Sequence, residues 1–312
     1  MLQDIIKRNH HKSIDLLLIG EMLVDVFTGN NPIILFGGSP ANISMNFKQL
    51  GFNPKLCASI GKDDEGRFLI SKLNERLLDT SLINQDNLKT TKVKVNQSVD
   101  TPIPTFERYS DHLIYYTDLL DSALKDTRIL HFSYWPLTKE PSKSTLLKAI
   151  SVAKEHDTLI AFDPNIHEAI QTNESIAHHE LLELIQYVDI IKPSLDDCMR
   201  LFNKKLDKDA YMDLFEQLGI GLILMTLGKE GVYVSYNGVR IHYPTYAKEV
   251  IDATGAGDAF WSGFYAGLNR EHTLANSIAI AQMTSAYALK QVGAITELPP
   301  IEVLENNLKG GD

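Results

Sequence analysis

DATGAGDAF, at residues 252–260, places two glycines and a carboxylate where a helix begins. Apolar residues recur at helical spacing after this segment, and residues 249–251 before it predict the end of a strand. Residues 255–258 are then a turn whose backbone amides lack intrahelical partners and lie at the positive end of the helix dipole. Such a turn can hold an anion such as a phosphate.

Asp258 is the carboxylate of this turn. It would repel a phosphate bound there, so we expect it to accept a proton from a hydroxyl that attacks the phosphate. A helix start with packing glycines and an Asp that favours the helix dipole also explains an isolated Gly-x-Gly-Asp. Other parts of the chain must decide between these interpretations.

Composition narrows the class of protein. The chain has 312 residues, of which 44% are apolar, enough for a sizeable core. Its net charge of −10 argues against a nucleic-acid partner, which needs clustered Lys and Arg. The sequence predicts neither a membrane span nor a secretory signal, so we expect a cytoplasmic protein without a membrane partner. Cys57 and Cys198 are predicted to pack in the core.

Apolar runs of strand length alternate with amphipathic stretches, which predicts an α/β fold with a mostly parallel sheet and helices on both faces. Asn237-Gly238 between two short apolar runs predicts a tight hairpin. The predicted strands cover residues 14–19, 55–60, 128–132, 158–163, 188–192 and 221–226, and the predicted helices cover 41–50, 67–78, 142–156, 176–186 and 208–218.

Two extended segments break this rhythm. Residues 24–36 and 90–116 read as strands that could form a small β layer over a substrate, a lid. An edge extension of the main sheet is the alternative.

Short polar side chains follow the first strand. Asp25 lies just beyond it, and the turn Gly37-Gly38 leads to Asn42 at the start of a helix. Parallel sheets bind ligands at the carboxyl ends of their strands, so these residues are predicted to face one crevice and to hydrogen-bond sugar hydroxyls. Asn42 is equally well explained as a helix cap, and Asp25 as a solvated loop residue.

The chain resembles the ribokinase-like (PfkB) carbohydrate kinases over roughly residues 14–300. GGSPAN (37–42) and DATGAGD (252–258) carry the resemblance, with GKDDEG (61–66) and TLGKEG (226–231) in order between them. The resemblance implies one domain, residues 1–312, folded as a three-layer α/β/α sandwich with a β lid. It also implies phosphorylation of a sugar hydroxyl by ATP with magnesium. A P-loop and a dinucleotide fingerprint are both absent from the sequence.

The resemblance also implies roles for individual residues. Asp258 matches the catalytic base, and the anion hole matches Gly255, Ala256 and Gly257. The expected substrate contacts are Asp25, Gly37, Gly38, Asn42, Asp258 and, at the end of the lid segment, Arg108. The expected nucleotide contacts are Lys192, Ser194, Thr226, Gly228, Gly231 and Gly257. Asp197 is expected to organise magnesium through water, and a potassium site is expected around Asp252, Thr254 and Gly293.

Two short motifs depart from the family's pattern. Ser194 and Asp197 stand where relatives commonly have Asn-x-x-Glu, so metal handling is expected to differ. His167 stands where fructokinase-like members often have Arg.

The motifs most resemble those of fructokinases. We expect fructose, phosphorylated at its 6-hydroxyl, because an anionic acceptor would meet Asp25 and Asp258, and Arg108 has acidic neighbours. The alternatives are a 2-keto-3-deoxygluconate kinase, a nucleoside kinase, and a catalytically silent regulator that binds sugar or nucleotide. An apolar strip at Val93 and Val95 predicts a homodimer through the lid.

Overall fold

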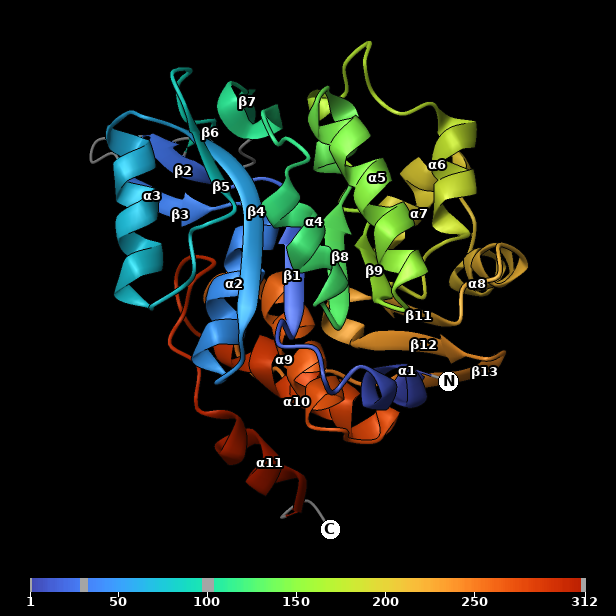
Figure 1. Cartoon of the computed structure of the whole chain (residues 1–312). Coiled ribbons are helices and arrows are strands. Elements are labelled where there is room, and N and C mark those ends of the chain that lie inside the picture. The colour runs from blue at the N-terminus through green and yellow to red at the C-terminus, as the bar shows by residue number, and fades with distance from the viewer. Residues whose placement is uncertain (1, 29–32, 97–103, 310–312) are drawn as a thin grey trace.

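A sheet of nine strands runs through the centre of the described part of the chain (Figure 1). The computed structural model describes residues 2–28, 33–96 and 104–309. From one edge to the other the strands are β13 (Val239–Tyr243), β12 (Val232–Tyr236), β11 (Leu222–Thr226), β10 (Ile190–Ile191), β9 (Leu159–Asp163), β8 (Ile129–Ser133), β1 (Leu16–Ile19), β4 (Pro54–Gly61) and β5 (Ile83–Asp86). β12 pairs antiparallel with both neighbours, and the other pairs are parallel.

Side chains alternate across the sheet and create two cores. Leu16 and Leu18 of β1 pack in the first core, and Leu17 and Ile19 pack in the second. The first core lies under α2 (Ser39–Gln49), α9 (Ala256–Asn269) and α10 (Leu274–Ala288), joined by α1 (Leu2–Arg8), α3 (Asp64–Glu75) and α11 (Ile301–Lys309). The second lies under α4 (Asp118–Lys125), α5 (Ser142–Glu155), α6 (His178–Ile185), α7 (Leu195–Phe202) and α8 (Lys208–Gln217). The predicted three-layer sandwich is confirmed.

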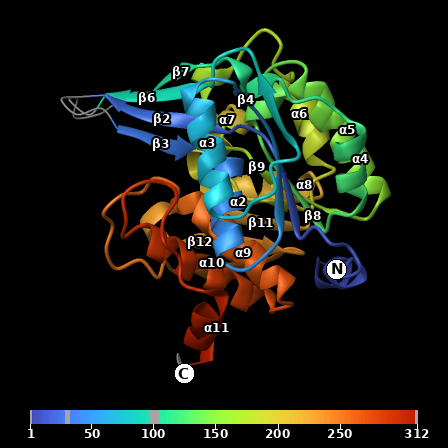
Figure 2. The ribbon, with the colours of Figure 1, turned by 60° about the vertical axis from the view of Figure 1, so that its left-hand side comes forward.

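A second sheet of four strands forms the lid. Its order is β3 (Ile33–Gly37), β2 (Leu23–Thr28), β6 (Lys92–Asn96) and β7 (Thr105–Glu107). Figure 2 shows β2, β3 and β6 extending away from the main body. The predicted lid segments thus contain the strands of a separate sheet, while their residues 29–32 and 97–103 lie outside the described residues. The single-domain boundary of 1–312 and the dimer through the lid stay predictions.

Four short 3₁₀ helices lie in the described connections: η1 (Ser110–His112), η2 (Trp135–Thr138), η3 (Glu168–Ile170) and η4 (Gly228–Glu230). The predicted hairpin joins β12 to β13 through Asn237 and Gly238, which both have positive φ (51° and 78°). No helix among residues 2–28, 33–96 and 104–309 is long and apolar enough to cross a bilayer. Both cysteines are buried, as predicted.

One strand prediction is wrong. Residues 249–251 lie in an irregular connection between β13 and α9, and Val250 and Ile251 are 60% and 58% exposed. The amide of Ile251 donates to the carbonyl of Leu289, which lies just after α10 and not in a strand. Residues 249–251 therefore do not pair with a strand through this bond. The apolar run therefore reflects exposed side chains near the start of α9 and not a buried strand.

Candidate active site

Asp258 lies in the first turn of α9, and both of its carboxylate oxygens accept hydrogen bonds from α2. Ser39 Oγ donates to Oδ1 at 2.6 Å, and Asn42 Nδ2 donates to Oδ2 at 2.9 Å. Burial raises the pKa of Asp258 to about 6, although these two hydrogen bonds favour its ionised form. The carboxylate is therefore mostly ionised at neutral pH and lies where two distant motifs meet.

The turn before Asp258 depends on a glycine in a left-handed conformation. Gly255 caps α9 with φ of 74°, and a Cβ there would lie 2.5 Å from Cα of Ala294. The loop that contains Gly293 thus packs directly on the start of α9. First-turn amides of a helix have no intrahelical acceptor, so Ala256, Gly257 and Asp258 present N–H groups at this end. The amide of Ala256 makes a long 3.3 Å bond to Ala253.

A buried cation lies beside this turn. Lys192 Nζ is 3.5 Å from the position that a Cβ on Gly257 would take and 3.2 Å from Oδ2 of Asp163. Trp261 Nε1 donates to the same oxygen at 2.9 Å. Burial raises the pKa of Asp163, and the charge of Lys192 opposes this effect. The helix start therefore combines first-turn amides with an ammonium group, which suits a phosphate.

Asp25 and the two glycines of GGSPAN lie on the lid side of Asp258. Burial, and then the charge of Asp258, raise the pKa of Asp25 to about 7. A Cβ on Gly37 would lie 2.5 Å from Oδ2 of Asp25, so glycine leaves room for that carboxyl group. Gly38 has φ of 99° and lies against the carbonyl of Glu21. The predicted sugar residues Asp25, Gly37, Gly38 and Asn42 are therefore brought together with Asp258.

Arg108, the remaining predicted substrate contact, is occupied by protein groups. Its Nε and Nη2 donate to Oδ2 of Asp111 at 3.0 and 2.6 Å. Its Nη1 donates to Thr138 Oγ1 at 2.6 Å and to the carbonyl of Ile170 at 2.9 Å. The guanidinium also lies over the ring of Trp135, 4.8 Å from its centroid. Arg108 thus ties the lid to the main body, and a direct contact with substrate stays a prediction.

The predicted nucleotide residues follow neighbouring strands. Ser194 caps α7 after β10 and bridges to Thr226 at the end of β11. Gly228 opens η4, and Gly231 follows it, where a Cβ would collide with the carbonyl of Tyr243. These residues and Lys192 lie at the carboxyl ends of parallel strands, the edge at which such sheets bind ligands.

Asp197 has a structural explanation that competes with its predicted metal role. Oδ1 accepts from the amide of Ile166 at 2.8 Å, and Oδ2 accepts from the amide and hydroxyl of Ser194 at 3.0 and 2.6 Å. The carboxylate is 7% exposed and completes a capping box with Ser194. Among the residues that the structure describes, no cluster of three or more His, Cys, Asp or Glu could hold a metal. Its role toward magnesium stays a prediction.

Asp252 joins the two loops of the predicted potassium site. Oδ1 accepts from the amide of Thr254 and Oδ2 accepts from the amide of Gly293, both at 2.9 Å. Partial burial pushes the pKa of Asp252 up, but these hydrogen bonds outweigh it and hold the pKa below its usual value. The three residues are therefore together, and the ion itself stays a prediction.

Three residues of this region were missed from the sequence. The amide of Ser39 donates to Glu21, and the hydroxyl of Ser39 donates to Asp258. Asp163 forms an ion pair with Lys192. An acid at or just beyond the carboxyl end of a buried strand was the available signal, since Asp163 ends β9, Glu21 lies two residues after β1, and both strands are wholly buried.

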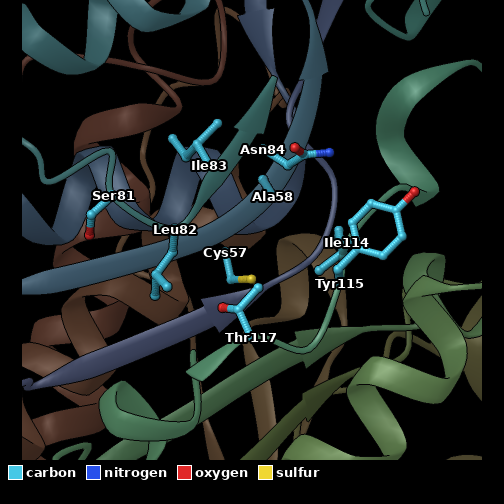
Figure 3. A pocket seen from close by; sticks show the side chains of 9 residues that line it. All are labelled: Cys57, Ala58, Ser81, Leu82, Ile83, Asn84, Ile114, Tyr115 and Thr117. Carbon is cyan, nitrogen blue, oxygen red and sulfur yellow. The ribbon is translucent and has the colours of Figure 1, made fainter. Parts of the chain in front are cut away.

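A separate cavity of about 230 Å³ lies at the β5 edge of the main sheet (Figure 3). Figure 3 shows side chains from β4, from β5 and the turn before it, and from the segment before α4, and none of the nine is a candidate site residue. Asn84 is already held by Ser59 and by the carbonyl of Leu113. The cavity is therefore not part of the site around Asp258.

Comparisons with known proteins identify relatives of this chain. The pfkB family carbohydrate kinase profile matches residues 24–301. An ATP-dependent 6-phosphofructokinase from Thermoanaerobacterium thermosaccharolyticum is 41% identical over 303 residues, which cover 95% of this chain and 94% of that protein. The structure of Halothermothrix orenii fructokinase is 30% identical with a TM-score of 0.78 and covers 89% of this chain and 100% of its own.

A Vibrio cholerae fructokinase, solved with fructose, ADP and a potassium ion, shares the fold with a TM-score of 0.83 at 23% identity, covering 95% of this chain and 98% of its own. Together, the profile match over most of the chain and the relatives show that the chain belongs to the pfkB family of carbohydrate kinases.

Proposed function

We propose that this carbohydrate kinase transfers the γ-phosphate of ATP to a primary hydroxyl of fructose, with Asp258 as the general base. The observation that carries the proposal is the meeting of three groups at the start of α9. These are the carboxylate of Asp258, held by Ser39 and Asn42, the first-turn amides, and the ammonium of Lys192 beside Gly257.

The chemistry follows from these positions. The acceptor hydroxyl attacks the γ-phosphorus in line, its proton passes to Asp258, and ADP leaves with the electrons of the broken bond. A base with a pKa of about 6 is ionised at neutral pH and still close enough to that pH to take up a proton efficiently. The amides at Gly255–Gly257 and the Lys192 ammonium stabilise the negative charge on the transferring group.

Magnesium would enter with the nucleotide and would supply positive charge that offsets the charge of the phosphates. Asp197 would act on it only at a distance, since its oxygens already accept three hydrogen bonds. Potassium would lie by the loops that Asp252 joins, where the Asp252 carboxylate suits a hard cation.

Charge near the acceptor favours a neutral sugar. Asp25 and Asp258 lie on the acceptor side. The Lys and Arg residues in the described part of the lid segments, 24–36 and 90–116, each have a carboxylate partner. Lys92 pairs with Glu65, Lys94 with Glu107, and Arg108 with Asp111. A phosphate on the acceptor would have to break one of these pairs.

Fructose 6-phosphate is the second candidate, because the relative that is 41% identical is named an ATP-dependent 6-phosphofructokinase. Lys94 is the cation best able to serve it, since its side chain is 40% exposed and could leave Glu107. The test is kcat/KM for fructose, fructose 6-phosphate, 2-keto-3-deoxygluconate, ribose and adenosine with ATP and magnesium. A lead of tenfold or more for a sugar phosphate or keto acid, about 1.4 kcal/mol in transition-state binding, would overturn the fructose assignment.

The same assay tests the silent alternative. ADP release with none of the five acceptors would favour a binding protein over an enzyme. ADP release with one acceptor that is lost in the Asp258→Asn variant would support the proposed chemistry.

A further inference from the structure

Glu21 is a buried carboxyl group held by two neutral partners. It lies two residues after the end of β1 and is 3% exposed. Oε1 accepts from the backbone amide of Ser39 at 3.1 Å, and Oε2 lies 3.1 Å from Ser133 Oγ at the end of β8. Burying a carboxyl group without a cation is costly, so this placement requires a reason beyond packing.

Ser39 connects this group to Asp258. Its amide donates to Glu21, and its hydroxyl donates to Oδ1 of Asp258 at 2.6 Å. A Cβ on Gly38 would lie 2.5 Å from the carbonyl oxygen of Glu21, so the start of α2 rests on the Glu21 backbone. Ser39 therefore cannot be placed independently of Glu21.

The orientation of the Asp258 carboxylate is then set by one turn of α2. Ser39 takes one oxygen and Asn42 takes the other. We propose that Glu21 is a positioning residue for the reaction: through Ser39 it fixes the direction in which the Asp258 carboxylate meets the acceptor hydroxyl. This inference rests on the proposed role of Asp258 as the base.

The protonated form of Glu21 explains how a buried carboxyl group can lie between Ser39 and Ser133. Burial, and then the charge of Asp258, raise the pKa of Glu21 to about 8. A protonated Glu21 accepts from Ser39 with one oxygen and donates to Ser133 with the other. The charged groups beyond these partners are Asp258 on α9, with Asp163 on β9 and Lys192 after β10 behind it. A neutral Glu21 adds no further negative charge next to the incoming phosphate.

The test compares Glu21→Ala, Glu21→Gln and Ser39→Ala with Ser44→Ala, which removes a buried hydroxyl of α2 that donates to the carbonyl of Ala41. We measure kcat and both KM values from pH 5 to 9. Loss of the hydrogen bond from Ser39 disfavours the ionised form of Asp258 and raises its pKa. The fall of kcat at low pH, the acid limb of the kcat–pH profile, should therefore move to higher pH in Ser39→Ala and Glu21→Ala. They should lower kcat about 10- to 100-fold with KM for ATP nearly unchanged.

Glutamine can accept from Ser39 and donate to Ser133, so Glu21→Gln should keep kcat at pH 7 within about threefold and leave the limb in place. Ser44→Ala should leave the limb in place even if it lowers Tm. An unmoved limb in Ser39→Ala, or Glu21→Gln as impaired as Glu21→Ala, would overturn the proposal. If Glu21→Ala does not fold, an unmoved limb in Ser39→Ala still overturns the proposal.

Failure of the base assignment has a different signature. Activity retained in Asp258→Asn would remove Asp258 as the base and the positioning role with it. An inactive Asp258→Asn together with unmoved limbs in the Glu21 and Ser39 variants would leave the base in place and remove only the positioning role.

Discussion

Replacing Lys192 by Met tests whether one buried cation serves both the fold and the bound phosphates. Lys192 and Asp163 are each 5% exposed, and Nζ lies 3.2 Å from Oδ2. Two unit charges at this separation attract by about 5 kcal/mol at an effective dielectric constant of about 20. Methionine keeps much of the volume of the stem but removes this attraction, which leaves Asp163 with the indole N–H of Trp261.

The expected losses follow from burial and position. Breaking a buried ion pair from one side costs about 3–5 kcal/mol. For a chain of 312 residues the unfolding entropy is about 0.65 kcal/mol per kelvin, so Tm should fall by about 5–8 °C. Because Nζ also lies beside Gly257, kcat should fall about 10²–10³-fold.

Thermal unfolding at pH 7 and ADP release at saturating substrates measure the two effects separately. Lys205→Met is the control, because Lys205 is exposed in the connection between α7 and α8, and its Tm should stay within about 1 °C of the parent. An unchanged Tm in Lys192→Met would show that the pair does not stabilise the fold. An unchanged kcat would remove Lys192 from phosphate binding.

Four further predictions concern the carboxyl groups. Asp258→Asn keeps the size of the side chain but removes the base, so kcat should fall about 10²–10⁴-fold while Tm hardly changes; retained turnover in the ADP assay would refute the role. Since the pKa of Asp258 is raised to about 6, kcat of the parent should fall below pH 6, by about tenfold from pH 7 to pH 5, and a flat profile would contradict this. Asp25→Ala should raise KM for sugar far more than KM for ATP, and equal effects would place Asp25 elsewhere. Glu21 has a folded-state pKa of about 8, above its unfolded value, so the stability it contributes is fully present below about pH 4 and is lost as pH rises to 8. Tm measured across this range should therefore decline less in Glu21→Gln, and parallel curves would argue against a protonated Glu21.

Much of the fold could be predicted from local patterns. Five of the predicted strands overlap β1, β4, β8, β9 and β11 along most of their length, because buried parallel strands read as continuous apolar runs. The strand predicted at 188–192 is reduced to the two residues of β10. α10 was left unassigned because it is apolar on most sides, so it lacks the amphipathic period that marks a surface helix.

Part of the candidate site could also be predicted from residues close together in the sequence. The glycines and Asp258 of DATGAGD, and the pairing of Ser194 with Asp197, follow from short spacings within the chain. The S-x-x-D spacing is itself a helix-capping signal, and it could have predicted the hydrogen bonds that Asp197 makes.

The sequence alone therefore determined most of the strands, several of the helices and the motifs that carry the resemblance to the family, because these depend on neighbours a few positions apart. Only the tertiary structure decided which charged side chains are held by other protein groups and which can meet a ligand. Asp258 meets Ser39 and Asn42 across 219 and 216 positions, and Trp261 meets Asp163 across 98. Arg108 is separated by 62 positions from the carbonyl of Ile170 that helps to hold it. Such contacts depend on how the strands are ordered in the sheet, and burial at those contacts sets the pKa values on which the proposed reaction depends.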